Sequence, residues 1–282
     1  DEGELVDAID IVDAQGDAAT LGSGLTPLYL TYRHYPVDDP KVTGAYGEWK
    51  DYNAYSDFIS SEGVPVFYAR VDHVSVPLAK EGTGQVVVDF TPEPLTQDVS
   101  FVFHIEKTAD VVVDSLTAEI SGIPSTMELT TGLILAQKTY KLLFRPTYAA
   151  LPSAADSASA EALRCEASVN IPGIVRSHTE DMVTGPGILQ IAIYTHYDYE
   201  EEGTQRKAAK VFHAGINLYH TLKERKSLQW DEEENGYRQA SRSITVEIGS
   251  PLNIDKDGIL NGGSTSTGLD QWIPGETFEI EV

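Results

Sequence analysis

The sequence is short of cysteine and of long apolar runs, and each shortage excludes a class of protein. Cys165 is the single cysteine among 282 residues, so the chain has no internal disulfide and no cysteine-based zinc cluster. It lies in the strand-like run RCEASVN, where we expect a buried and inert thiol. No apolar run approaches the ~18 residues that a membrane-spanning helix needs.

Basic residues are also scarce. Lys and Arg total 20 against 44 Asp and Glu, which gives a formal net charge of −24. A field of this sign repels phosphate backbones and anionic lipids, and it argues against nucleic acid or a bare membrane surface as a partner. An acidic surface of this kind ordinarily keeps a protein dispersed.

Helical periodicity is weak, whereas period-two alternation runs through most of the chain. GQVVVDFTP places Val86, Val88 and Phe90 on one face, and GILQIAIYTHYDYE and RSITVEIG alternate in the same way. SAADSASAEALRCEA, DYNAYSDFISSEG and YHTLKERKSLQW have room for a short helix each. The pattern predicts an all-β protein with two antiparallel β-sandwich domains in tandem.

The segment FTPEPLTQD is the best domain boundary, because two prolines within three residues favour an extended link between strands. We therefore divide the chain near Pro94 into an N-terminal domain, 1–94, and a C-terminal domain, 95–282. The segments 36–64, 149–163 and 200–208 are expected to be long irregular loops.

The stretch SLTAEISGIPSTMELTTG, residues 115–132, begins as a strand and then breaks at Gly122 and Pro124. Gly122 allows a bulge or a turn with positive φ, and Pro124 suits a crossover outside a sheet. Met127 and Leu129 would then fold back over the core before Gly132. This pattern indicates a corner between the two sheets of a sandwich.

Motifs of catalysis and metal binding are sparse. DKDG at 255–258 is similar to the start of a calcium loop, but the acidic residue at the twelfth position is missing, which favours an ordinary turn. The acidic runs YDYEEE and DEEEN are typical of solvated loops. No GxSxG elbow or glycine-rich phosphate loop is present. We expect no cofactor, no metal and no enzymatic activity, and we rank a glycoside hydrolase or esterase last.

Several of these segments resemble one family, the fimbrial anchor-type, fimbrillin-like lipoproteins of Bacteroidetes. VDSLTAEISGIPSTMELTTG resembles a recurring segment of these proteins, and VVVDFTPEPLTQDVSFVFHI is similar to the junction between their two domains. LYLTYRHYP, INLYHTL and RSITVEIGSPLNI resemble further strands, so the resemblance spans about 28–254.

The resemblance implies two transthyretin-like β-sandwich domains on a lipid-anchored protein of the outer membrane that faces the cell surface. It implies a role in anchoring or ending a fimbria, or in adhesion, with fimbrial subunits or other surface proteins as partners. It carries over no catalytic residue. The chain begins at Asp1, which by itself fits either a trimmed cytosolic protein or a mature exported one. The resemblance implies the second, an exported lipoprotein whose signal and lipid-bearing cysteine come before Asp1.

The leading hypothesis is therefore a non-catalytic surface subunit that engages its partner by β-strand addition. The terminal run ETFEIEV places Phe278, Ile280 and Val282 on one face, which fits either a closing strand or a docking edge. The alternative is a carbohydrate-binding surface lipoprotein of a glycan-uptake system. Trp49, Trp230 and Trp272 would build its sugar-stacking face, although a buried aromatic core explains them equally well.

Overall fold

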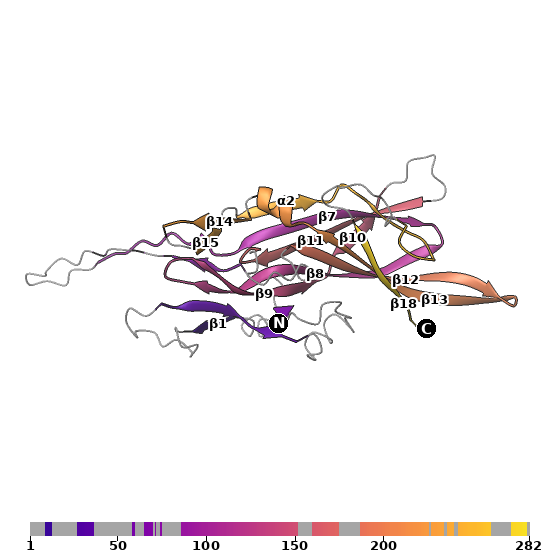
Figure 1. Ribbon diagram of the computed structural model, residues 1–282, viewed down its shortest axis with the longest axis horizontal. Coiled ribbons are helices and arrows are strands. Elements are labelled where there is room, and N and C mark those ends of the chain that lie inside the picture. Colours follow the sequence, from indigo (N-terminus) through magenta and orange to yellow (C-terminus); the bar gives the residue numbers. More distant parts are fainter. Residues whose placement is uncertain are drawn as a thin grey trace, which may run out of the picture.

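The protein is described here from a computed structural model, shown in Figure 1. It describes residues 9–12, 27–36, 58–59, 65–69, 71, 74, 86–151, 160–174, 187–225, 227–233, 236–239, 242–260 and 272–280. Within these ranges the regular elements are strands apart from one helix, α2 (Tyr219–Glu224), which confirms the all-β prediction and one of the short helices. No helix in the described ranges has the length and apolarity to cross a membrane.

The larger of the sheets has eleven strands among the described residues. Its main path is β14 (Leu228–Asp231), β15 (Gly236–Gln239), β9 (Ile134–Phe144), β8 (Val111–Glu128), β12 (Ile188–Glu201), β13 (Thr204–Asn217) and β18 (Ile273–Ile280). Four N-terminal strands complete it: β1 (Ile9–Val12), β2 (Tyr29–Tyr32), β3 (His34–Tyr35) and β4 (Phe58–Ile59). Of these, β2 pairs with β8 and β4 pairs with β9.

The smaller sheet follows the order β10 (Thr147–Ala150), β11 (Ala160–Ile171), β7 (Gln97–Thr108) and β16 (Ser243–Glu247), with β17 (Leu252–Ile254) also beside β7. A further pair, β5 (Phe67–Tyr68) and β6 (Glu93–Pro94), stands apart. Most pairings are antiparallel, as predicted, but β16 and β17 run parallel to β7 and β4 runs parallel to β9.

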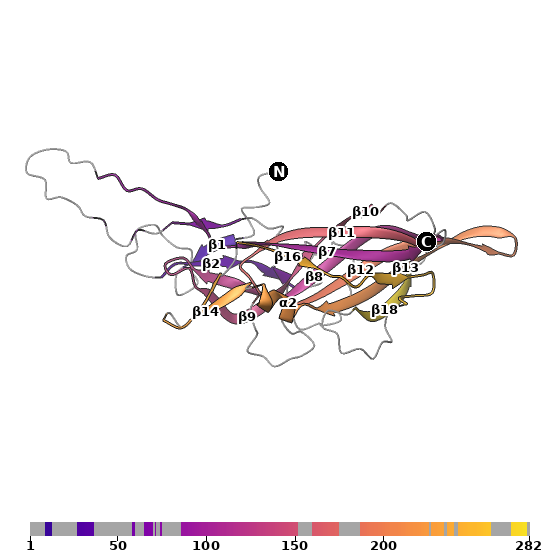
Figure 2. The ribbon, with the colours of Figure 1, turned by 90° about the horizontal axis from the view of Figure 1, so that it is seen from above.

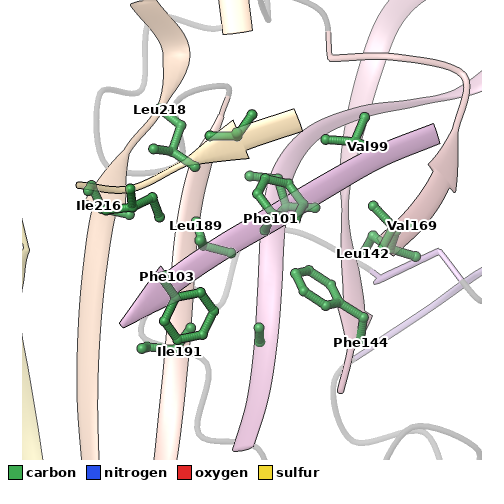
Figure 3. Close-up of a cluster of buried hydrophobic side chains, with 14 of the residues drawn as sticks. Val99, Phe101, Phe103, Leu142, Phe144, Val169, Leu189, Ile191, Ile216 and Leu218 are labelled. Atoms are coloured by element: carbon green, nitrogen blue, oxygen red, sulfur yellow. The ribbon is translucent and has the colours of Figure 1, made fainter. Parts of the chain in front are cut away.

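The two sheets pack face to face through alternating side chains. Odd-numbered residues of β7 point inward, and Phe101 stacks on Phe144 of β9 with ring centroids 5.7 Å apart. Figure 3 shows the rings of Phe101 and Phe144 in the core. The other labelled residues around them are Val99, Phe103, Leu142, Val169, Leu189, Ile191, Ile216 and Leu218. Because each strand exposes alternate residues to opposite faces, one period-two pattern per strand is enough to build this core.

The predicted corner at residues 115–132 is wrong, because the chain stays in one sheet. β8 continues without interruption from Val111 to Glu128, and Pro124 pairs with Thr139 of β9. The ladder absorbs the break with register shifts after Ser121 and after Pro124. Such bulges accommodate a residue that cannot donate a hydrogen bond, so a proline need not leave the sheet.

Other parts of the same stretch are confirmed. Gly122 has a φ of 87°, the left-handed region in which glycine is favoured. Gly132, with a φ of 73°, lies in the turn between β8 and β9. Met127 is fully buried and pairs with Leu30 of β2.

The N-terminal strands belong to the same sheet as the centre of the chain. Leu30, Tyr32 and Ile59 are part of one core cluster with residues of strands from β7 to β17. In the described ranges no sheet is built from residues 1–94 alone, apart from the small β5–β6 pair, which itself ends at Pro94. The division near Pro94 into two transthyretin-like domains stays a prediction.

Three further predictions from the sequence differ from the structure. Residues 160–167, the described part of a possible short helix, lie in β11 because Ala160–Ile171 pairs along its whole length with β7. Residues 200–208 are not a loop but the end of the β12–β13 hairpin. Residues 86–92 carry a strand pattern, yet they form no strand in the described structure.

We expect Gly122→Val to destabilise the fold. A β-branched residue at a φ of 87° is strained, and left-handed backbone costs a non-glycine residue about 1–2 kcal/mol. Gly249→Val is the matched control, because an added Cβ at Gly249 meets nothing within 4 Å. Thermal melting should show a clear loss for Gly122→Val and a smaller one for Gly249→Val; equal melting temperatures would contradict the bulge geometry.

Candidate functional site

The C-terminal strand closes one edge of the larger sheet. Phe278 of β18 pairs with Val211 of β13, and Ile280 pairs with Ala209. This pairing is that of a closing strand within its own sheet, one of the two alternatives that the sequence leaves open. In the described part of the chain no strand pairs with the other side of β18. The side-chain surroundings of Phe278 and Ile280, and all of Val282, lie outside the described residues.

Local sequence explains how this strand reaches its place. Pro274 lies near the beginning of β18, an edge position where a missing N–H is tolerated. The next residue, Gly275, approaches His213 closely: an added Cβ would lie 2.9 Å from its Cβ and 3.2 Å from its carbonyl oxygen. Glycine at this position therefore allows β18 to pass the register shift between Phe212 and Ala214.

Trp272 anchors the beginning of the same strand. Its indole is 4% exposed, packs edge-on against Phe103 at 5.7 Å, and donates a hydrogen bond from Nε1 to the carbonyl oxygen of Ser250 at 2.9 Å. A buried ring cannot stack on a sugar, so Trp272 belongs to the core. Trp49 and the side chain of Trp230 lie outside the described residues.

The β12–β13 hairpin extends past its neighbours on both sides. Pairing of β12 with β8 ends at Tyr197, and pairing of β13 with β18 ends at Ala209. Residues 198–207 are exposed, and Figures 1 and 2 both show this ribbon projecting from one end of the molecule. Residues 198–201 and 204–208 therefore each present an edge that is unpaired among the described strands.

The turn of this hairpin determines which backbone groups face outward. Glu201 pairs with Thr204, and the two residues between them, Glu202 and Gly203, have φ values of 51° and 76°. In such a two-residue turn the flanking residues exchange both hydrogen bonds. Even-numbered residues of β13 therefore bond to β12, whereas the N–H and C=O groups of Gln205 and Lys207 face the open edge.

The same alternation assigns the backbone of β18. Ala209 and Val211 are odd-numbered, so they face β18 and bond to Ile280 and Phe278. The N–H of Glu279 consequently points away from β13, toward the open side of the sheet. These outward groups are what an incoming strand needs for main-chain hydrogen bonds.

The hairpin is anchored at its base on the inner face. Lys210 lies over the ring of Tyr197 at 5.4 Å and donates from Nζ to the carbonyl oxygen of Lys256 at 2.9 Å. The ring of Tyr197 lies 6.2 Å from that of Tyr199. These contacts tie the ribbon to the smaller sheet and leave its tip in solvent.

The motif DKDG and Cys165, which we expected to be an ordinary turn and a buried thiol, have structural roles. Asp255 Oδ1 accepts the N–H groups of Asp257 and Gly258 at 2.8 and 2.9 Å, so DKDG is a turn whose carboxylate is already engaged. Cys165 is buried on β11, as predicted, and burial raises the pKa of its thiol to about 12. Among the described side chains no three His, Cys, Asp or Glu residues gather as a metal site would require.

One charged pair lies inside the molecule and was not found from the sequence. Lys141 Nζ lies 3.0 Å from Glu119 Oε1, and both side chains are 2% exposed. Lys141 also lies over the ring of Phe58 at 5.7 Å. The pair sits on the face of β8 and β9 that points away from the main core, where a solvated charge would be expected from alternation alone.

The sequence matches no family model and no curated protein. Among solved structures, a proposed adhesin from Bacteroides thetaiotaomicron aligns over 90% of this chain and 68% of that chain, with 10% identity and a TM-score of 0.40. A TM-score of this size does not establish a shared fold, so no property of that protein is transferred here.

Sequence reasoning missed the open hairpin edge at Gln205 and Lys207. The signal was present in YDYEEEGTQRK, where two alternating runs flank a Glu-Gly pair, but acidic composition made it resemble a loop. The hairpin extends beyond the last residues at which β8 and β18 pair with it. No local sequence pattern shows where that pairing ends.

We expect Lys141→Met to lower the free energy of unfolding by about 3–5 kcal/mol, because it leaves the buried Glu119 carboxylate without this partner. Arg206→Met is the matched control: Arg206 also lies 3.0 Å from a carboxylate, that of Glu201, but both side chains are more than half exposed. Its loss should stay within about 1 kcal/mol. Urea unfolding at neutral pH measures both, and equal effects would show that Glu119 does not depend on Lys141.

Cys165 should resist thiol reagents in the folded protein, because burial and its raised pKa keep the thiolate scarce. A colorimetric thiol assay at mildly alkaline pH should give no rapid reaction in buffer and one equivalent after unfolding in urea. Rapid labelling of the native protein would contradict the buried position.

Proposed function

We propose that this protein is a non-catalytic cell-surface protein of the fimbrial anchor, tip or adhesion type that binds a partner subunit by β-strand addition. The observation that carries the proposal is the open edge of β18, whose pairing in the described structure is with β13 alone. An edge of this kind binds through backbone groups and needs no catalytic side chain.

The chemistry of the described side chains supports a binding role. The single cysteine is inert, the calcium-like motif is a turn, and the buried Glu119–Lys141 pair is shielded from solvent. Such groups stabilise or shape the fold and offer no nucleophile to a substrate.

Surface location is part of the same proposal. The resemblance to Bacteroidetes fimbrial anchor-type lipoproteins supports an outer-membrane position with attachment through a lipid anchor. The net charge of −24 agrees with this mode of attachment, because an acidic body does not adhere to anionic lipid by itself. Two transthyretin-like domains belong to this proposal and not to the observed fold.

Glu279→Pro tests the docking edge. It removes an N–H that faces the open side of β18 and leaves intact the hydrogen bonds from Phe278 and Ile280 to β13. We expect the variant to stay folded and to lose pull-down of the fimbrial subunits encoded beside it. Glu279→Ala, which keeps the N–H, should bind like the wild type.

Deleting residues 278–282 should abolish the same binding, because it removes the last paired residues of the edge strand, from Phe278 to Ile280. If Glu279→Pro and the deletion both stay folded and bind those subunits as well as before, the docking site lies elsewhere. Retention of the protein on a polysaccharide affinity gel, lost in Trp49→Ala or Trp230→Ala, would favour the carbohydrate-binding alternative.

A further inference from the structure

The inner face of the β12–β13 hairpin stays aromatic beyond the point where the second layer of the sandwich ends. Odd-numbered residues of β12 point into the core up to Ile193, and Tyr197 and Tyr199 lie on the same side of the strand. At their level β7 ends at Thr108, and Val111, just after the turn, pairs with Tyr197. Figures 1 and 2 show the hairpin continuing past this point.

The other strands of the smaller sheet end at the same level. β11 begins at Ala160, opposite Thr108, and β17 ends at Ile254, beside Lys107. No described strand of that sheet continues over the hairpin, and Tyr199 is 38% exposed. Tyrosine is enriched at contact surfaces because it joins a large apolar ring to a polar hydroxyl. The inner face of the hairpin therefore has the character of a binding surface.

Charged groups of both signs surround the two rings. Arg206 is paired across the hairpin with Tyr199, and its guanidinium lies 3.0 Å from the carboxylate of Glu201. Both of these charged side chains are more than half exposed. Lys210 lies over the ring of Tyr197 at 5.4 Å. The surface thus combines aromatic rings with hydrogen-bond donors and an acceptor.

This combination selects among classes of ligand. An anionic ligand would meet Glu201 and a protein of net charge −24, whereas a cationic ligand would meet Arg206 and Lys210. An apolar segment would cover the Arg206–Glu201 pair and return no hydrogen bonds, which is unfavourable. A neutral sugar avoids these costs. Its hydroxyls accept from a guanidinium and donate to a carboxylate, while its C–H face packs on a tyrosine ring.

The two rings are placed to contact successive units of a sugar chain. The centroids of Tyr197 and Tyr199 are 6.2 Å apart, and their planes differ by 50°. A two-stranded ribbon is strongly twisted, so side chains two residues apart on one face diverge in direction. Rings that diverge in this way suit a soluble chain that turns from one sugar to the next, and not the flat face of a crystalline polymer.

We propose that the inner face of the β12–β13 hairpin binds a neutral glycan chain, with Tyr199 as the main stacking residue and Tyr197, Arg206 and Glu201 around it. The inference rests on the adhesive role within the proposed function, to which it gives a ligand class and a site. The site is separate from the docking edge on β18, which pairs with residues 209–215 of β13. It also contains no tryptophan, unlike the sugar-stacking face expected from the sequence.

Affinity electrophoresis of the purified full chain tests the proposal. Each native gel carries one neutral polysaccharide, namely mixed-linkage β-glucan, galactomannan, arabinoxylan or α-mannan, and further gels carry polygalacturonate or no polymer. At least one neutral polymer should retard the wild type, and none should retard Tyr199→Ala. Tyr199→Trp keeps an aromatic face and should keep the retardation.

Variants on the same hairpin serve as controls. Arg206→Met removes a hydrogen-bonding group from the inner face and should weaken the retardation. Asp198→Ala changes the opposite face, where Asp198 is paired with Lys207, and should behave like the wild type. Circular dichroism and thermal melting check that each variant keeps the fold of the wild type.

The proposal is overturned by a wild type that no neutral polymer retards, and by retardation that survives in Tyr199→Ala. Retardation by polygalacturonate alone would also overturn it, because the ligand would then be anionic. Retardation lost in Trp49→Ala and kept in Tyr199→Ala would place the sugar on another surface. Glu279→Pro should leave the retardation unchanged, so glycan binding and subunit docking at β18 succeed or fail separately.

Discussion

Pairing on both sides of β8 is the constraint on which the rest of the larger sheet depends. β9 lies along one side, while β12 and then β2 share the other. Residues 116–125 are buried throughout, so both faces of the strand are covered as well. A strand of this length crosses from one neighbour to the next only if its direction is adjusted, and the bulges around Gly122 and Pro124 provide that adjustment. At the bulge, the hydroxyl of Ser121 accepts a hydrogen bond from the N–H of Ile188 at 3.0 Å, where β12 begins.

Burial on both faces also explains the charges inside the molecule. Alternation along β8 assigns Glu119 to the face away from the main core, where a carboxylate would ordinarily meet water. That face is covered, and Phe58 of β4 lies over Lys141 there. A buried carboxylate is tolerated when a cation and hydrogen bonds accompany it, and replacing such a pair with apolar residues often stabilises a protein. The Glu119–Lys141 pair is therefore buried because an N-terminal strand covers this face, and not because the fold needs the pair for stability.

The sequence predicted where most strands lie, but it did not predict which strands pair with one another. Period-two runs predicted β7, β12, β13, β16 and β18. A strand with one buried face needs an apolar side chain at every second residue, and this alternation is visible in the sequence. The prediction was wrong where tertiary pairing overrides local preference: alanine-rich residues 160–166 pair along β7 although their composition favours helix. The sequence did not predict the open edge at Lys207 for another reason. An edge depends on how far the neighbouring strand continues, and among the described residues the pairing of β18 with β13 ends at Ile280. Neither segment shows this relation by itself.

The long strands of both sheets run close to the long axis of the molecule, as Figure 1 shows for β7, β8, β12 and β13. A pull along that axis would load their ladders in shear, so that many backbone hydrogen bonds would have to break together. A pull across the axis would open the same ladders one bond at a time, as a zipper opens. With no disulfide in the chain, resistance to tension comes from this geometry, and it is greatest along the long axis of the molecule. The fold is thus anisotropic: stiff lengthwise and easily peeled from the side.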